Sequence, residues 1–118
     1  MIKLVNFKVL HMFGEYVNSS DIGLQVEALW GLSNISCHSS YTAAIIIDDE
    51  VLAMIVTAMG SRHICVKREA YFVIGNLFNE LTSKDLVCLI DKYPGILVEY
   101  FNGLEYFANN KPTVIHIL

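Results

Sequence analysis

Apolar residues recur at spacings of three and four along almost the whole chain, which is the spacing of one face of an α-helix. Prolines occur at only two positions, Pro94 and Pro112, and no convincing β-hairpin turn lies between alternating apolar and polar runs. The pattern therefore predicts an all-α protein. The expected core stripes are Leu10, Phe13 and Val17; Leu24, Ala28, Leu32 and Ile35; Leu52, Ile55 and Met59; Val66, Ala70, Val73 and Leu77; and Leu97, Tyr100 and Leu104.

Capping residues and glycines divide this pattern into successive helices. Asp21, Ser39 and Thr82 are suitable N-caps, and Gly60 is suited to end a helix. We expect the acidic run at 48–50 to be a solvated helix start, where negative charge suits the helix dipole. The signals predict helices over Lys3–Val17, Asp21–Ser36, Ser39–Ile47, Asp49–Met59, His63–Asn79, Thr82–Lys92 and Gly95–Phe107, and a short one over Thr113–Leu118.

Two of the expected helices carry nearly the same motif, 42 residues apart. Residues 27–35 read Glu-Ala-Leu-Trp-Gly-Leu-Ser-Asn-Ile, and residues 69–77 read Glu-Ala-Tyr-Phe-Val-Ile-Gly-Asn-Leu. Both keep the glutamate, the alanine, the asparagine and a central aromatic residue. A helical motif with a period in the forties is typical of α-solenoids, whose repeats bury their faces by stacking on their neighbours.

The apolar stripes follow the same period. The stripe that starts at Leu10 recurs at Leu52 after 42 residues and at Leu97 after 45, so about three residues are inserted near 79–83. The period divides the chain, which we expect to be a single domain over 1–118, into a partial repeat at 1–37, a complete repeat at 38–80 and a partial repeat at 81–118.

The motif Glu-Ala-x-aromatic-x-x-x-Asn resembles the third helix of the armadillo repeats of importin α, the family of receptors for nuclear localisation signals. The resemblance implies an armadillo-type α-solenoid, a right-handed superhelix of three-helix repeats, with about two full repeats plus partial flanking units here. It further implies a protein of the cytoplasm and nucleus that holds a Lys/Arg-rich extended peptide of a cargo protein for nuclear import, with a karyopherin as a further partner. Two positions depart from the family pattern, because Phe72 replaces the usual tryptophan and His38 the usual glycine.

Helix geometry gives this motif a physical meaning. Residues at i and i+4 share a helix face, so Trp30 projects with Asn34, and Phe72 with Asn76. Asparagine amides can bind a peptide backbone, and aromatic faces can hold the stem and charge of lysine or arginine. Glutamates near these aromatic and asparagine residues would add negative charge to the surface. The resemblance aligns Glu80 with an acidic position that contacts a peptide lysine. The candidate peptide-binding residues are Trp30, Asn34, Phe72, Asn76, Glu80, Glu27 and Glu69.

Two alternatives remain open at this stage. The asparagines can instead form a hydrogen-bond ladder that joins one repeat to the next. The whole chain can also be a non-catalytic armadillo scaffold that binds a folded partner, or associates with itself through open solenoid ends, without recognising a nuclear signal. Open ends of a solenoid expose apolar faces that capping repeats normally cover.

Composition and charge exclude several other function classes. Hydrophobic residues make up 54% of the chain and charged residues 17%, which excludes a disordered tail. The net charge of −4 argues against a nucleic-acid partner, which needs clustered positive charge. No apolar run approaches the roughly 18 residues of a membrane span, so we expect no membrane partner.

Catalysis is not expected from the motifs present. Cys37, Cys65 and Cys88 match no zinc, redox or disulfide spacing, so we expect buried, reduced thiols. The four histidines lack metal-ligand spacing, and no nucleophile or phosphate-loop motif occurs. The sequence therefore predicts no enzyme, no catalytic or metal-binding residue and no cofactor. We expect the basic pair Lys67 and Arg68 to face solvent on the outer side.

Overall fold

The computed structural model describes residues 5–109 of the chain. This range contains seven helices and no strand. The prediction of an all-α protein is confirmed for these residues. The expected short helix at 113–118 lies outside them. The helices are α1 (Phe7–Val17), α2 (Ile22–Ile35), α3 (Ser39–Ile47), α4 (Asp49–Met59), α5 (Ile64–Glu80), α6 (Ser83–Lys92) and α7 (Ile96–Asn109).

Side-chain caps fix several of the predicted boundaries. Asp21 accepts a hydrogen bond from the backbone N–H of Leu24 at 3.2 Å, and Thr82 accepts one from Asp85 at 3.1 Å. Asp48 does the same for Val51 at 3.1 Å, so the acidic run is a helix start as expected. These bonds satisfy N–H groups that the first turn of a helix leaves unpaired.

One helix start and one N-cap differ from the prediction. The first helix begins at Phe7 instead of Lys3, because Asn6 is extended and its Oδ1 accepts the backbone N–H of Val9 at 3.2 Å. Ser39 is not a cap: it is the first residue of α3, and His38 occupies the N-cap position without a side-chain hydrogen bond. The predicted stop at Gly60 is confirmed, since Gly60 directly follows α4 as its C-cap.

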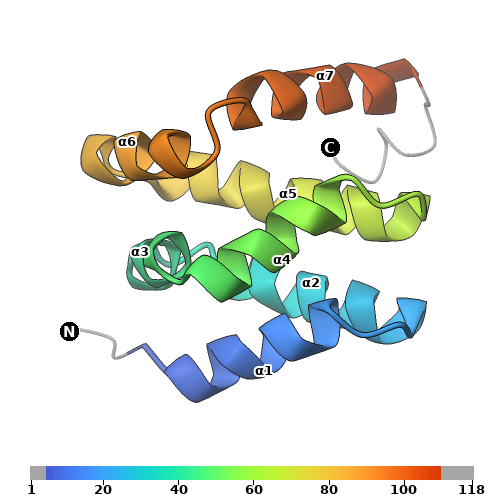
Figure 1. Ribbon diagram of the computed structural model, residues 1–118, viewed down its shortest axis with the longest axis horizontal. Coiled ribbons are helices and arrows are strands. Elements are labelled where there is room, and N and C mark those ends of the chain that lie inside the picture. The colour runs from blue at the N-terminus through green and yellow to red at the C-terminus, as the bar shows by residue number, and fades with distance from the viewer. Residues whose placement is uncertain (1–4, 110–118) are drawn as a thin grey trace.

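Helices that share the 42-residue offset pack on one another. The helices are arranged in tiers (Figure 1). The first tier contains α1 and α2, the second contains α3, α4 and α5, and the third contains α6 and α7. Between tiers, α1 packs on α4, α2 on α5, and α3 on α6. Within the middle tier, α4 packs on both α3 and α5. The internal sequence similarity thus corresponds to a spatial one for α1 with α4 and for α2 with α5.

The inserted residues lengthen one helix. An offset of 42 residues places the bounds of α2 on 64–77, but α5 continues to Glu80 and has 17 residues where α2 has 14. The insertion is therefore an additional turn, Phe78 to Glu80, at the C-terminal end of α5. Phe78 packs on the Tyr100 ring of α7, with ring centroids 5.1 Å apart.

The predicted stripes of α4 and α5 are buried, whereas the buried residues of α2 and α7 differ from the predicted ones. Leu52, Ile55, Met59 and the four stripe residues of α5 are all buried. Leu24, however, is 43% exposed, and the expected stripe of α7 is only partly buried. In α7 the buried positions are Ile96, Gly103 and Phe107. The helix turns this face to α5 because Gly103 leaves room for the buried Tyr71 ring.

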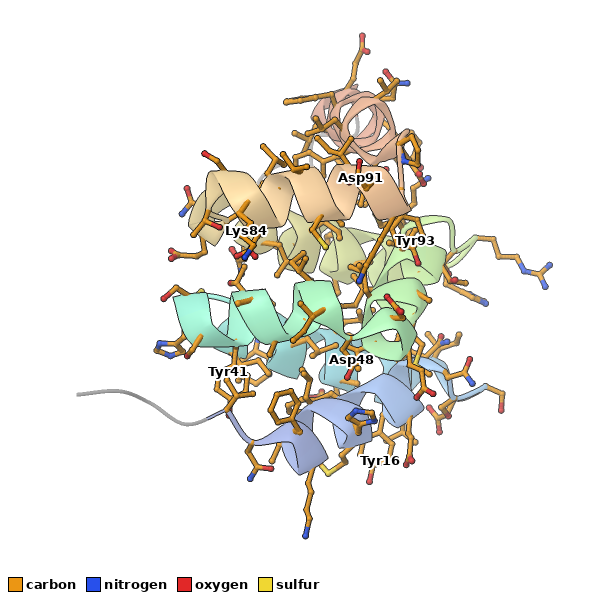
Figure 2. All side chains as sticks on the ribbon, turned by 60° about the vertical axis from the view of Figure 1, so that its left-hand side comes forward. Tyr16, Tyr41, Asp48, Lys84, Asp91 and Tyr93 are labelled. Carbon is orange, nitrogen blue, oxygen red and sulfur yellow. The ribbon has the colours of Figure 1, made fainter. Side chains whose placement is uncertain are left out.

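Polar contacts connect the first and second tiers. Tyr41 and Asp48 lie on the side of the second tier that faces α1 (Figure 2). The Tyr41 hydroxyl accepts the backbone N–H of Asn6 at 3.0 Å, and the Asp48 carboxylate lies 2.9 Å from His11 Nε2. These contacts hold the start of α1 on α3 and on the α3–α4 junction.

A lysine connects the second and third tiers. Lys92 Nζ donates to the Ile46 carbonyl and lies at the same distance, 2.7 Å, from the Asp49 carboxylate. The hydrogen bond to Asp49 raises the pKa of Lys92. The end of α6 is therefore held at the junction of α3 and α4.

Replacing Gly103 by alanine is expected to destabilise the α5–α7 contact. A Cβ at this position would lie 2.0–2.1 Å from the ring and hydroxyl of Tyr71, which is itself held by a 3.1 Å hydrogen bond to the Glu99 carbonyl. We expect Gly103→Ala to lower the free energy of unfolding by about 1–3 kcal/mol in urea titrations. Gly95→Ala is the matched control, because a Cβ there meets nothing within 4 Å. Equal stability of the two variants would contradict this account of α7 packing.

Candidate functional site

Two adjacent hollows lie along the exposed face of α5. The first, which we call the Trp30 hollow, has a volume of about 320 Å³ and is lined by Trp30, Ser33, Arg68, Glu69 and Phe72. The second, the Tyr100 hollow, has a volume of about 270 Å³ and is lined by Arg68, Tyr71, Phe72, Gly75, Asn76, Asn79, Tyr100 and Leu104. Arg68 and Phe72 border both, so the hollows form one surface that crosses from α2 over α5 to α7.

The two predicted aromatic residues meet at the Trp30 hollow. Trp30 projects from α2 and is 58% exposed, and Phe72 projects from α5 and is half-buried. Because α2 packs on α5, residues 42 positions apart line the same hollow. An indole exposed to this extent contributes little to the core and leaves its face accessible to a ligand.

The two predicted asparagines differ in their surroundings. Asn76 Nδ2 donates to the Ser33 carbonyl at 2.9 Å and to the Ser33 hydroxyl at 3.0 Å, so its amide joins α5 to α2. Asn34 is exposed and makes no hydrogen bond through its side chain within residues 5–109. A bond between neighbouring repeats therefore exists, as the alternative reading of the motif expects, but its acceptor is Ser33 and not the other asparagine.

One of the three predicted glutamates lines a hollow. Glu69 borders the Trp30 hollow, and burial raises the pKa of its carboxyl although the nearby Arg68 lowers it. Glu27 is exposed and Glu80 is partly buried, and both lie outside the two hollows. The negative charge of the surface is thus concentrated at a single carboxylate.

The expectation that Lys67 and Arg68 both face solvent on the outer side is wrong. Arg68 is partly buried and lines both hollows, with its Nε 3.8 Å from Glu69 Oε1. Lys67 is also partly buried, and its Nζ lies over the Tyr106 ring, 5.4 Å from the centroid. Arg68 stands four residues before Phe72, so the spacing that pairs Phe72 with Asn76 could have identified it.

Sequence reasoning also missed the contribution of α7. Tyr100 was expected only in a core stripe, but it lines the second hollow beside Asn79 of the additional α5 turn. Tyr71 and Tyr100 stack with ring centroids 5.7 Å apart, so the wall of this hollow is continuous between the two helices. Nothing in the local sequence indicates this contact, which depends on how α7 packs on α5.

The described residues offer few other chemical features. All three cysteines are free, and Cys37 is exposed, so the expectation of buried thiols is wrong at this position. Within residues 5–109 no group of three or more histidine, cysteine, aspartate or glutamate side chains is arranged to hold a metal ion. None of the helices in this range is long and apolar enough to cross a membrane.

The different surroundings of the asparagines lead to a stability prediction. We expect Asn76→Ala to lower the free energy of unfolding by about 1–3 kcal/mol, because it removes two hydrogen bonds between α2 and α5. Asn34→Ala is the matched control, with the same change in helix propensity and an expected effect within about 0.5 kcal/mol. Chemical denaturation of both variants measures the difference, and equal losses would show that Asn76 does not join the helices.

The raised pKa of Glu69 leads to a pH prediction. Since the pKa is higher in the folded than in the unfolded chain, the folded state binds the proton more tightly, and the contribution of Glu69 to stability falls as the pH rises through the raised pKa. Glu69→Gln should therefore be more stable than the parent at pH 7, with a difference that disappears in acid. Thermal unfolding from pH 3 to 8 tests this, and a parent protein more stable than the variant at pH 7 would contradict it.

Comparison with known proteins gives no relative for this chain. No protein-family model matches it, and no curated protein and no solved structure is significantly similar to it. The function of the surface therefore has to be argued from its own residues.

Proposed function

We propose that the chain is an armadillo-type α-solenoid that binds an extended, Lys/Arg-rich peptide of a partner protein on the two hollows. The repeat architecture is supported by the packing of α1 on α4 and of α2 on α5, at the offset that relates their sequences. In this arrangement α2 and α5 are the third helices of successive repeats. The resemblance of their motif to importin α assigns the module to the recognition of nuclear localisation signals.

The observation that carries the proposal is the exposed Trp30 beside Phe72 and Glu69 in one hollow. The aliphatic stem of a lysine or arginine fits against the aromatic faces, and its charge is attracted both by the indole and by the Glu69 carboxylate. The free amide of Asn34, one turn after Trp30, is available to the backbone of the same peptide. These three contacts bind an extended chain by its backbone and by one basic side chain.

The small size of the surface sets the expected affinity. Neighbouring helices lie about 10 Å apart and an extended peptide advances about 3.3 Å per residue, so each aromatic position serves about three peptide residues. Two such positions hold only a short segment of the peptide. The entropic cost of ordering that segment offsets much of the favourable free energy of binding. We therefore expect a dissociation constant in the micromolar range and sensitivity to salt.

A second candidate function has support from the outer faces of the terminal helices. Phe7, Met12 and Tyr16 of α1 are exposed, as are Val98 and Phe101 of α7. Such apolar surfaces favour a scaffold that binds a folded partner or a second copy of itself. Concentration-dependent sedimentation together with a lack of peptide binding would favour this function.

Peptide binding can be measured by fluorescence anisotropy with a labelled Lys/Arg-rich peptide and a lysine-to-alanine peptide as control. We expect Trp30→Ala to weaken binding about tenfold or more, because it removes the most exposed aromatic face of the hollow. Tyr16→Ala is the matched control, since Tyr16 is an exposed aromatic residue on α1 outside both hollows. The emission of Trp30, the only tryptophan of the chain, provides a second, label-free signal.

Binding that falls with added salt, with the alanine peptide and with Trp30→Ala would support the proposal. If the folded, monodisperse protein does not bind at high micromolar concentration, or if both variants bind alike, the hollows are not a site for basic peptides.

A further inference from the structure

We propose that the Tyr100 hollow is a subsite for an acidic side chain of the bound peptide, so that the surface selects a segment with both a basic and an acidic residue. This inference rests on the proposed function, because it assigns a second position of the same peptide. It concerns aspartate or glutamate, whose carboxylate is complementary to the charge and the donors of this hollow.

The charge of the Tyr100 hollow is the first argument. Arg68 is the only charged residue among the eight that line it, and Glu69 lies at the other hollow. The carboxylates that α7 carries, at Glu99 and Glu105, do not line it either. The Trp30 hollow therefore has one charge of each sign, and the Tyr100 hollow has a single positive charge that a second basic side chain would meet with repulsion.

The availability of the Arg68 guanidinium is the second argument. Its closest approach to Glu69 is 3.8 Å, which is too long for a hydrogen bond. Its N–H groups make no hydrogen bond within the described part of the chain. A guanidinium can donate two parallel hydrogen bonds to one carboxylate, a pairing stronger than bonds between neutral groups. Arg68 thus borders the hollow with its hydrogen-bond donors unused.

Neutral donors in the hollow point to the same ligand. Asn79 is exposed, so its amide is accessible from the hollow. Burial raises the pKa of Tyr100, so its hydroxyl stays protonated at neutral pH and can donate a hydrogen bond. Gly75 keeps that hydroxyl accessible, since a Cβ there would lie 2.6 Å from the Tyr100 oxygen. A carboxylate can accept these bonds in addition to those of Arg68, so the charge of Arg68 makes the choice between an acidic and a basic ligand.

The positions of the hollows set the spacing within the peptide. Both lie on α5 and meet at Arg68 and Phe72, so their ligand groups are separated by about the distance between adjacent helices, which an extended peptide covers in about three residues. Because residues at even spacing share one side of an extended chain, the preferred segment has an acidic residue two or four positions from the basic residue at Trp30.

The test compares peptides that are identical except at one position. A basic peptide carries glutamate, alanine or lysine two or four residues before its central lysine, or two or four residues after it. In anisotropy titrations we expect the glutamate peptide of one order to bind about tenfold more tightly than the alanine peptide, as a hydrogen-bonded charge pair allows, and the lysine peptide to bind more weakly. Equal affinities of these peptides in both orders would overturn the subsite, with the proposed function intact.

Variants of the protein assign the preference to Arg68. Arg68→Gln should bind the glutamate and alanine peptides equally, and Arg68→Glu should prefer the lysine peptide. Lys67→Gln is the matched control: it removes the same charge from the adjacent residue, which lies outside both hollows, and should keep the preference for glutamate. A preference that survives Arg68→Gln or disappears in Lys67→Gln would overturn the assignment. Failure of every peptide to bind the parent would instead refute the proposed function, and the subsite with it.

Discussion

The packing of α5 against α2 is the contact on which the other features depend. One side of α5 is apolar and buried, with Val66, Ala70, Val73 and Leu77 in the core. The opposite side carries Arg68, Phe72 and Asn76 at four-residue intervals, which places them in one row on the helix. Because α2 lies alongside, Trp30 completes a hollow with this row, and Asn76 bonds to Ser33. A single helix thus supplies a face of the core and the face that borders both hollows.

Helical periodicity predicted most of the helices. It was least accurate where contacts between helices determine which side chains are buried. The three-and-four spacing gave a stripe in five of the seven described helices, whereas α3 and α6 were predicted from capping signals. It failed in α7, where Gly103, Ile96 and Phe107 are buried in place of the expected stripe. The sequence around Gly103 does not reveal that a tyrosine from another helix will occupy the space beside it. Local capping also decided the start of α1, because Asn6 ends the extended segment before the first apolar turn.

The sequence predicted some residues of the candidate site and not others. The repeated motif identified Trp30, Phe72 and Asn76, because the offset that relates two helices also places them side by side. It gave the two asparagines the same role, yet only Asn76 has an earlier tier within reach of its amide, and Asn34 belongs to the first described tier. Arg68 was missed because a charged residue in a basic pair was assumed to be solvated. The stacking of the tiers places Trp30 of α2 and Tyr100 of α7 at the hollows that Arg68 borders, and the sequence around Arg68 does not indicate this.

The additional turn of α5 makes the two repeats unequal, and this has a consequence for the register of a bound chain. A strictly periodic surface offers a long ligand several equivalent positions, each displaced by one repeat. Here the turn from Phe78 to Glu80 occurs in α5 and has no counterpart in α2, and it brings Asn79 to a hollow beside α7. The two hollows therefore differ in shape, charge and donors. For a peptide bound as proposed, displacement by one repeat would place each side chain in different surroundings, and the inequality of the repeats would favour a single alignment.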